Sequence, residues 1–168
     1  MRGLELKPEE AKEIIKQLID DLAAVNRVLE KIRPCEVSFI LHPPAMTADQ
    51  SIKLGVSKKK VVKSLVFASE KGGFLVLIQG SRQVDWKKLK SVTETKSPRL
   101  ATPEEVIKWT GCKIGGVSPF SCDLPIFMDA PILKEPWVNP SGGSSVAGIK
   151  LKPSELKKIT TARVCELS

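Results

Sequence analysis

Apolar residues recur at alternating spacings of four and three in the first part of the chain, which is the period of an α-helix. They are Ala11, Ile15, Leu18, Leu22, Val25, Leu29 and Ile32. Pro8 and the two glutamates after it suit the first turn of a helix, and Pro34 ends the pattern. The pattern therefore predicts one long helix over residues 8–33, packed on its own domain. A coiled-coil seam is the alternative, although a run this short is close to the minimum for a coiled coil.

After Pro34 the helical period gives way to short alternating or apolar runs that are separated by turn residues. We predict strands over residues 36–41, 61–69, 74–79, 124–128, 137–139, 147–151 and 162–167. We predict short helices over residues 47–53, 84–90, 102–111 and 153–158. The glycine pair at 72–73 lies between two of the strands and indicates an antiparallel hairpin.

These elements predict an α+β fold rather than a repeated βαβ unit. The expected architecture is a mixed, mostly antiparallel sheet or pseudo-barrel with surrounding helices, together with the long N-terminal helix. Thr47 with Gln50 and Thr102 with Glu105 have the spacing of capping boxes, which supports two of the short helices.

Composition fits a single globular domain that acts in the cytoplasm. The chain has 168 residues, of which 42% are hydrophobic and 27% charged. No apolar run approaches the roughly 20 residues that span a bilayer, and the first residues lack the apolar region of a signal peptide. We therefore expect no membrane contact.

Net charge is +8 and the pI is about 9.4. Such a surface attracts phosphate groups, and nucleic acid is the most common polyanion in the cytosol. The alternative is that the basic charge serves solubility alone.

Metal and cofactor chemistry is not expected. The four cysteines form no CxxC pair and His42 is the only histidine, so we predict free, buried thiols and no zinc site. Neither GxGxxG nor GxxxxGK[ST] occurs, so no nucleotide cofactor is indicated. His42 has no adjacent nucleophile motif, which favours a structural or substrate-contacting role over that of a general base.

Lysines gather at the start of the predicted strand over residues 61–69. Lys58, Lys59 and Lys60 are typical of a solvated turn. Lys63 lies inside the apolar stretch that follows. Strand alternation favours an outward side chain there, and projection into a cleft is the alternative.

Two glycine-rich loops are candidate binding elements. Gly115 and Gly116 can adopt positive φ, and successive N–H groups in such a loop can hold an oxygen that carries negative charge. The alternative is an ordinary tight turn before Pro119. Residues 139–145 have the same character, and the two loops could form two walls of a pocket.

Several segments follow one another in the order of a known family. They are HPPAMT at 42–47, VVKSLVF at 61–67, GFLVLIQGSRQVDWKKL at 73–89, ATPEEV at 101–106, TGCKIGGVSPF at 110–120, the glycine loop at 141–143 and IKLKPSEL at 149–156. The chain thus resembles the YbaK / prolyl-tRNA-synthetase-associated editing domain family over about residues 36–166. The resemblance implies an N-terminal helical extension at residues 1–34 and a free-standing editing domain at residues 35–168.

The resemblance also implies a function and a site. The family hydrolyses the ester between a wrong amino acid and the terminal adenosine of tRNA, using backbone groups of a GXXXP loop, water and the ribose hydroxyl of the substrate. The implied catalytic residues are Lys63 and Gly115. The implied substrate-binding residues are His42, Thr47, Gly116, Val117, Ser118, Pro119, Ser141, Gly142 and Gly143.

The implied substrate is the acceptor end of a proline tRNA, or a related tRNA, that carries a small amino acid such as cysteine or alanine. Prolyl-tRNA synthetase is the implied partner, no cofactor or metal is implied, and a homodimer stays open. The sequence departs from the family at Ser81, where Asp is frequent, and in the loop at 141–145, which lacks the usual Lys or His. Two alternatives follow: a tRNA- or nucleotide-binding module without hydrolysis, or a protein that docks on a synthetase through its long helix.

Overall fold

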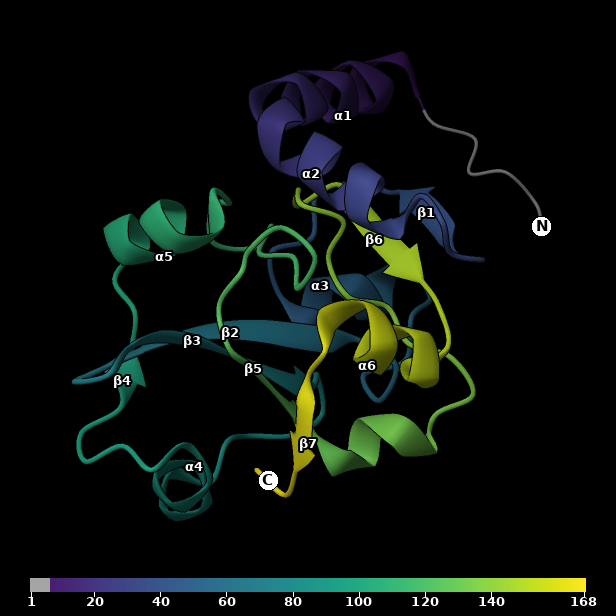
Figure 1. Cartoon of the computed structure of the whole chain (residues 1–168). Coiled ribbons are helices and arrows are strands. Elements are labelled where there is room, and N and C mark those ends of the chain that lie inside the picture. The colour runs from purple at the N-terminus through teal and green to yellow at the C-terminus, as the bar shows by residue number, and fades with distance from the viewer. Residues whose placement is uncertain (1–6) are drawn as a thin grey trace.

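The structure, a computed structural model, describes residues 7–168 and has the predicted α+β class (Figure 1). The helices are α1 Pro8–Asp20, α2 Leu22–Ile32, α3 Ala48–Lys53, α4 Trp86–Thr93, α5 Pro103–Thr110 and α6 Pro153–Thr160, with a 3-10 helix η1 at Ala130–Lys134. The strands are β1 Ser38–Leu41, β2 Val62–Ser69, β3 Gly72–Gln79, β4 Arg99–Leu100, β5 Ile126–Asp129, β6 Ala147–Lys150 and β7 Arg163–Cys165.

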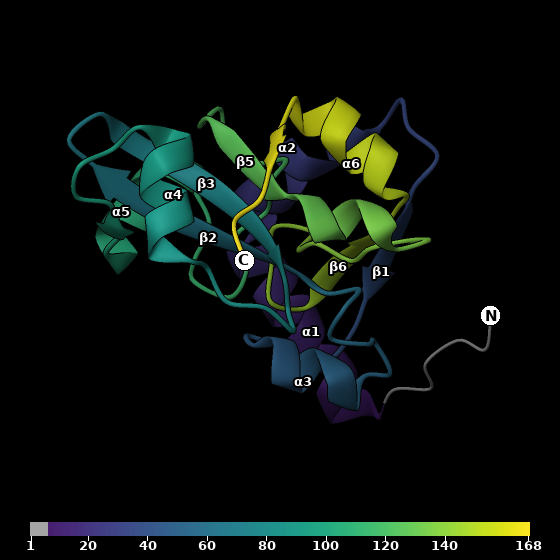
Figure 2. The same ribbon diagram turned by 90° about the horizontal axis from the view of Figure 1, so that it is seen from below.

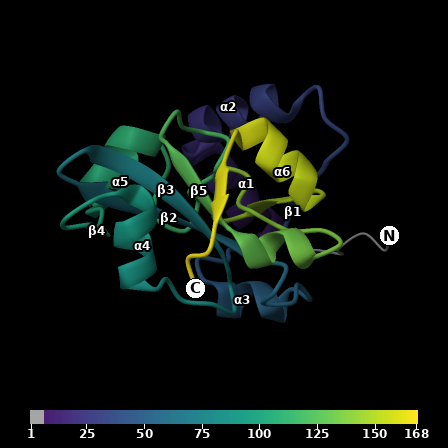
Figure 3. The ribbon, with the colours of Figure 1, turned by 60° about the horizontal axis from the view of Figure 1, so that its bottom comes forward.

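The main sheet has the strand order β4-β2-β3-β5-β7. β2 is antiparallel to both β3 and β4, whereas β5 is parallel to both β3 and β7. Within residues 7–168 the sheet stays open, with β4 and β7 as its edges, so the pseudo-barrel alternative does not apply. β1 and β6 form a separate antiparallel ribbon that lies next to α6 (Figures 2 and 3).

The hydrophobic core lies on both faces of this sheet. A larger cluster joins the sheet to α2, α5 and α6, and a smaller one joins it to α4 on the opposite side (Figure 1). Leu75 and Leu77 of β3 face the larger cluster, while Val76 between them faces the smaller one. None of the helices in the described part of the chain has the length and apolar character needed to cross a bilayer.

The local signals for turns and caps are confirmed in the fold. The Thr102 side chain accepts a hydrogen bond from the Glu105 N–H, the Glu105 side chain accepts one from the Thr102 N–H, and Gly111 ends α5 at φ +65°. β2 and β3 form the predicted hairpin, with Ser69 opposite Gly72. The turn lies at residues 70–71, before the glycine pair, because Gly73 is needed inside β3. A Cβ there would lie 2.7 Å from the ring of Trp109.

The prediction of one helix over residues 8–33 is wrong, because the helix breaks at Asp21, where φ is −105° and ψ is 10°. The Asp21 side chain points inward. It accepts a hydrogen bond from Gln17 at 2.8 Å and pairs with Lys113 at 3.5 Å. Because the axis changes direction there, no single stripe can face the domain in both halves. Ile15 and Leu22 of the predicted stripe are 57% and 52% exposed. Val25 and Ile32 of the stripe are buried as predicted, whereas the other buried positions, Ile14, Ala24 and Val28, lie outside it.

Three further predictions need correction. Residues 137–139 form isolated bridges, Val138 with Leu151 and Asn139 with Val61, and do not pair with β5. α4 begins later than predicted, because the Asp85 side chain caps it by accepting from the N–H groups of Lys87 and Lys88. All four cysteines are free, but only Cys112 is buried.

The C-terminal segment is attached to the sheet through a buried carboxyl group. It runs along β5 as β7 (yellow in Figure 3). Asp129, at the end of β5, is fully buried and accepts hydrogen bonds from the Leu167 N–H at 2.8 Å and the Ser168 hydroxyl at 2.7 Å. The Leu167 carbonyl in turn accepts from the Asp85 N–H at 2.7 Å. These bonds join residues 167–168 to the start of α4.

Candidate functional site

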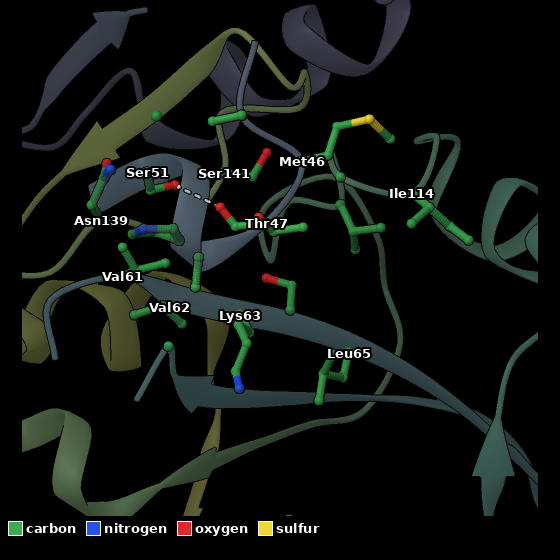
Figure 4. A pocket seen from close by; sticks show the side chains of 18 of the residues that line it. Met46, Thr47, Ser51, Val61, Val62, Lys63, Leu65, Ile114, Asn139 and Ser141 are labelled. Atoms are coloured by element: carbon green, nitrogen blue, oxygen red, sulfur yellow. Dashed lines mark hydrogen bonds between the residues drawn. The ribbon is translucent and has the colours of Figure 1, made fainter. Parts of the chain in front are cut away.

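A cavity of about 520 Å³ opens between the first half of β2, the start of α3 and the two glycine-rich loops (Figure 4). Most of its wall is apolar, with Ala45, Val61, Val62, Val66, Ala101 and Val106 among the lining residues. Polar groups come from a few positions, and an apolar pocket with a few converging polar groups is typical of a small-molecule site.

The cavity brings together six of the residues predicted for the site. They are His42, Thr47, Lys63, Gly115, Val117 and Ser141. The other five, Gly116, Ser118, Pro119, Gly142 and Gly143, are buried behind the wall and do not line it. The glycines among these five have packing roles instead. A Cβ at Gly116 would lie 3.1 Å from Ser144 of the second loop, and one at Gly143 would lie 3.1 Å from Ala24 of α2.

The loop at residues 113–117 presents backbone to the cavity. Gly115 has φ +90°, a conformation that favours glycine, and a Cβ there would lie 3.2 Å from Met46. The Gly116 N–H donates to the Lys113 carbonyl at 3.0 Å. Within residues 7–168, the N–H groups of Gly115 and Val117 have no hydrogen-bond partner. Both residues line the cavity, and an N–H group without a partner can donate to an oxygen atom of a ligand.

Lys63 lies at the edge of the cavity. Its side chain runs from β2 away from Thr47 and Ser141 (Figure 4), and its ammonium donates to the Arg82 carbonyl at 2.5 Å. Burial lowers the pKa of Lys63 below 10.5 because it removes water from the ammonium. Asp49 opposes this pKa shift and Lys58 adds to it. An ammonium has three N–H donors, so the bond to Arg82 leaves two for a ligand.

His42 is held by its own backbone neighbour. Its Nδ1 lies 2.8 Å from the Pro43 carbonyl oxygen, so Nδ1–H is the donor and Nε2 is left as an acceptor in the neutral ring. Burial lowers the pKa of His42 below 6.5, although the bond to Pro43 opposes this. His42 is therefore neutral at neutral pH. Thr47 caps α3 by accepting from the Gln50 N–H at 3.2 Å, which uses one of the two lone pairs of its hydroxyl oxygen.

The sequence analysis missed Ser64. In β2, the Val62 N–H donates to the Asn139 carbonyl, and the Val66 carbonyl accepts from the Ala101 N–H. The backbone hydrogen-bonding groups of these alternate residues therefore point away from β3. Ser64 lies between them and, by strand alternation, shares the face of β2 that carries Val62 and Val66. Its Oγ is buried, and no residue of the described chain hydrogen-bonds to it. A polar residue between Val62 and Val66 on an apolar face was the signal in the sequence.

Asn139 is the second missed residue. It lines the cavity, and its Oδ1 is buried without a hydrogen-bond partner in residues 7–168. The sequence signal was weaker here, because an asparagine before a proline is typical of an ordinary turn.

The chain is similar to proteins whose names state a role in tRNA charging. The family described as "Aminoacyl-tRNA editing domain" matches residues 42–159. "Uncharacterized protein YwhH" of Bacillus subtilis is 32% identical over 122 residues, which cover 70% of this chain and 77% of that protein. "Proline--tRNA ligase" of Thermotoga neapolitana is 42% identical over 79 residues, but these cover 47% of this chain and only 14% of the ligase.

A solved structure supports the same relationship. "Crystal structure of a putative trans-editing enzyme for prolyl tRNA synthetase" describes a chain that is 33% identical, with a TM-score of 0.79. The match covers 86% of this chain and 96% of that one. With most of its length matched in sequence and in fold, the chain belongs to the aminoacyl-tRNA editing domain family.

Proposed function

We propose that the protein is an aminoacyl-tRNA deacylase that hydrolyses the ester of a mischarged tRNA. The observation that carries this proposal is the combination, in one cavity, of an apolar wall with the unpartnered N–H groups of Gly115 and Val117. The wall suits a small side chain. The amides suit the oxyanion that forms when water attacks the ester carbonyl.

The proposed reaction needs few catalytic side chains. Water adds to the carbonyl carbon, the loop amides stabilise the oxyanion, and the ester C–O bond then breaks. The ribose oxygen leaves with a proton, and the products are the free amino acid and uncharged tRNA. The ribose hydroxyl beside the ester assists the water, and Lys63 holds the phosphate or ribose of the terminal adenosine as a point charge.

The proposed substrate is a proline tRNA, or a related tRNA, that carries a small amino acid such as cysteine or alanine. The similarity to proline–tRNA ligases supports this choice. Prolyl-tRNA synthetase is the proposed partner, and the cytoplasm, where tRNA is charged, is the proposed location.

Incubation with a set of charged tRNAs tests the function. We expect release of cysteine or alanine from proline tRNA well above the spontaneous rate, and no release of proline. The released amino acid and the remaining charged tRNA are both counted. Binding of the charged tRNA without release would contradict the proposal and would favour a binding module, the alternative that the altered loop at 141–145 suggests.

The surface beside the cavity offers a binding site for tRNA phosphates. The ammonium groups of Lys60 and Lys150 lie 4.4 and 4.8 Å from the centre of the Trp137 ring. Neither lysine has a carboxylate partner in the described part of the chain, whereas Lys58 pairs with Asp49 at 2.5 Å. Lys60 directly precedes Val61, which lines the cavity. We therefore assign Lys60 and Lys150, rather than Lys58, to the acceptor strand.

We expect tRNA affinity to fall as salt rises, with a slope of about −0.7 to −0.9 in log K against log salt for each phosphate contact. The double variant Lys60→Ala/Lys150→Ala should make this slope shallower by about one for each lysine that contacts a phosphate. Titration at several salt concentrations measures the slope. Lys87→Ala/Lys90→Ala on α4 removes equal charge on the far side of the sheet and should leave it unchanged. Equal slopes for both double variants would rule out this assignment.

A further inference from the structure

The Oδ1 of Asn139 is a buried acceptor that the fold itself does not use. The residue lines the cavity, and no donor within residues 7–168 reaches its Oδ1. A buried polar atom without a partner destabilises the free protein. Such atoms are rare in native proteins and call for a specific explanation.

The backbone holds Asn139 in place from both sides. Its N–H donates to the Lys60 carbonyl at 2.7 Å, and its carbonyl accepts from the Val62 N–H at 3.2 Å. Pro140 follows and fixes the direction of the chain. The backbone of Asn139 is therefore held beside the first residues of β2, so only rotation of its side chain could bring Oδ1 to another partner.

Gly148 leaves the space that the side chain occupies. A Cβ at position 148 would lie 2.6 Å from Asn139 Oδ1, so only glycine permits this arrangement. The Gly148 backbone is itself fixed, because it pairs with Ile40 of β1. The side-chain amide of Asn139 therefore packs against the backbone of Gly148 at the cavity wall.

We infer that Asn139 determines substrate specificity by accepting a hydrogen bond from an N–H group of the aminoacylated tRNA end. This inference rests on the proposed function. An aminoacyl-adenosine end that carries alanine has two such groups, the α-ammonium of the amino acid and the N6 amino group of the adenine. Both fit an amide oxygen, and a bond to the ammonium would be the stronger because its donor is charged.

Binding, rather than hydrolysis, is the measurement that tests the inference. The probe is a tRNA whose terminal ribose carries alanine through a non-hydrolysable amide. A second probe carries propionate instead, which removes the α-ammonium, and a third ends in purine riboside, which removes N6. We expect one of these two changes to weaken binding to the natural protein by about tenfold, or about 1.4 kcal/mol. The same change of the probe should not weaken binding to the Asn139→Leu variant.

Two other variants sharpen the result. Asn139→Asp keeps an acceptor at the same place and should retain the preference for the intact probe. Asn26→Leu makes the same chemical change on the exposed side of α2 and should behave like the natural protein. If neither substrate change couples to position 139, the inference is wrong. Because the probes cannot be hydrolysed, this outcome is separate from a failure of deacylation.

Thermal unfolding distinguishes a specificity residue from a structural one. Loss of an unpartnered buried acceptor should leave the Tm of Asn139→Leu unchanged, or raise it by up to about 4 °C for each kcal/mol gained. A residue that served only the fold would lower the Tm on replacement. A lower Tm together with unchanged probe preference would therefore overturn the inference.

Discussion

Gly115→Ala should lower kcat/KM for deacylation by about 10²- to 10³-fold, which is the usual effect of losing one donor to an oxyanion. Gly115 lines the cavity at φ +90°, and its N–H has no partner in the described chain. An added methyl group would have to move either the loop or Met46, which is 3.2 Å away. Either movement displaces the amides from the ester carbonyl.

The same change also strains the fold, so two effects must be separated. Alanine at positive φ costs about 1 kcal/mol or more of the free energy of unfolding. Gly55→Ala is a matched control, because Gly55 has φ +84°, no atom within 4 Å of its Cβ position and no place in the cavity wall. Thermal melts and deacylation kinetics on both variants give turnover per folded molecule. Normal turnover in folded Gly115→Ala would show that residues 113–121 form an ordinary turn without a catalytic role.

Lys63→Ala should lower kcat/KM by roughly tenfold or more, or at least about 1.4 kcal/mol of transition-state stabilisation. The Lys63 ammonium donates to the Arg82 carbonyl at the cavity edge and keeps two donors for the substrate. Because burial lowers the pKa of Lys63, its charge is lost at a lower pH than that of an exposed lysine. Catalysis above the spontaneous rate should therefore decline as the pH rises toward 10.5, and it should do so before that value is reached.

Lys59→Ala is the control for this experiment, because Lys59 is an exposed neighbour that does not line the cavity. It should keep both its activity and the decline at high pH. A folded Lys63→Ala protein with natural kcat/KM would remove Lys63 from the mechanism.

Signals that act over a few residues could be predicted from the sequence. The Thr102 cap, the Gly111 end of α5 and the β2–β3 hairpin all depend on groups that are close along the chain. The break at Asp21 could not be predicted, because neither proline nor glycine marks it and one partner of the Asp21 carboxylate, Lys113, is distant in sequence. The parallel placement of β5 between β3 and β7 is likewise set by long-range pairing, which no local pattern encodes.

The candidate site shows the same division. Glycine-rich loops and a lysine in an apolar strand stand out in a sequence, and Gly115 and Lys63 do line the cavity. Ser64 and Asn139 did not stand out, because what distinguishes them is that a buried oxygen has no partner. That property exists only once the chain is packed.

The hydrogen bonds from residues 167–168 to Asp129 affect how long the folded protein survives in the cell. Detachment of Leu167 and Ser168 would leave the Asp129 carboxyl without its two donors. A buried polar group left without its partners costs about 1–3 kcal/mol, and more when it is charged, against a total stability of about 5–15 kcal/mol for a domain. Molecules without this attachment would therefore unfold more often and be degraded sooner.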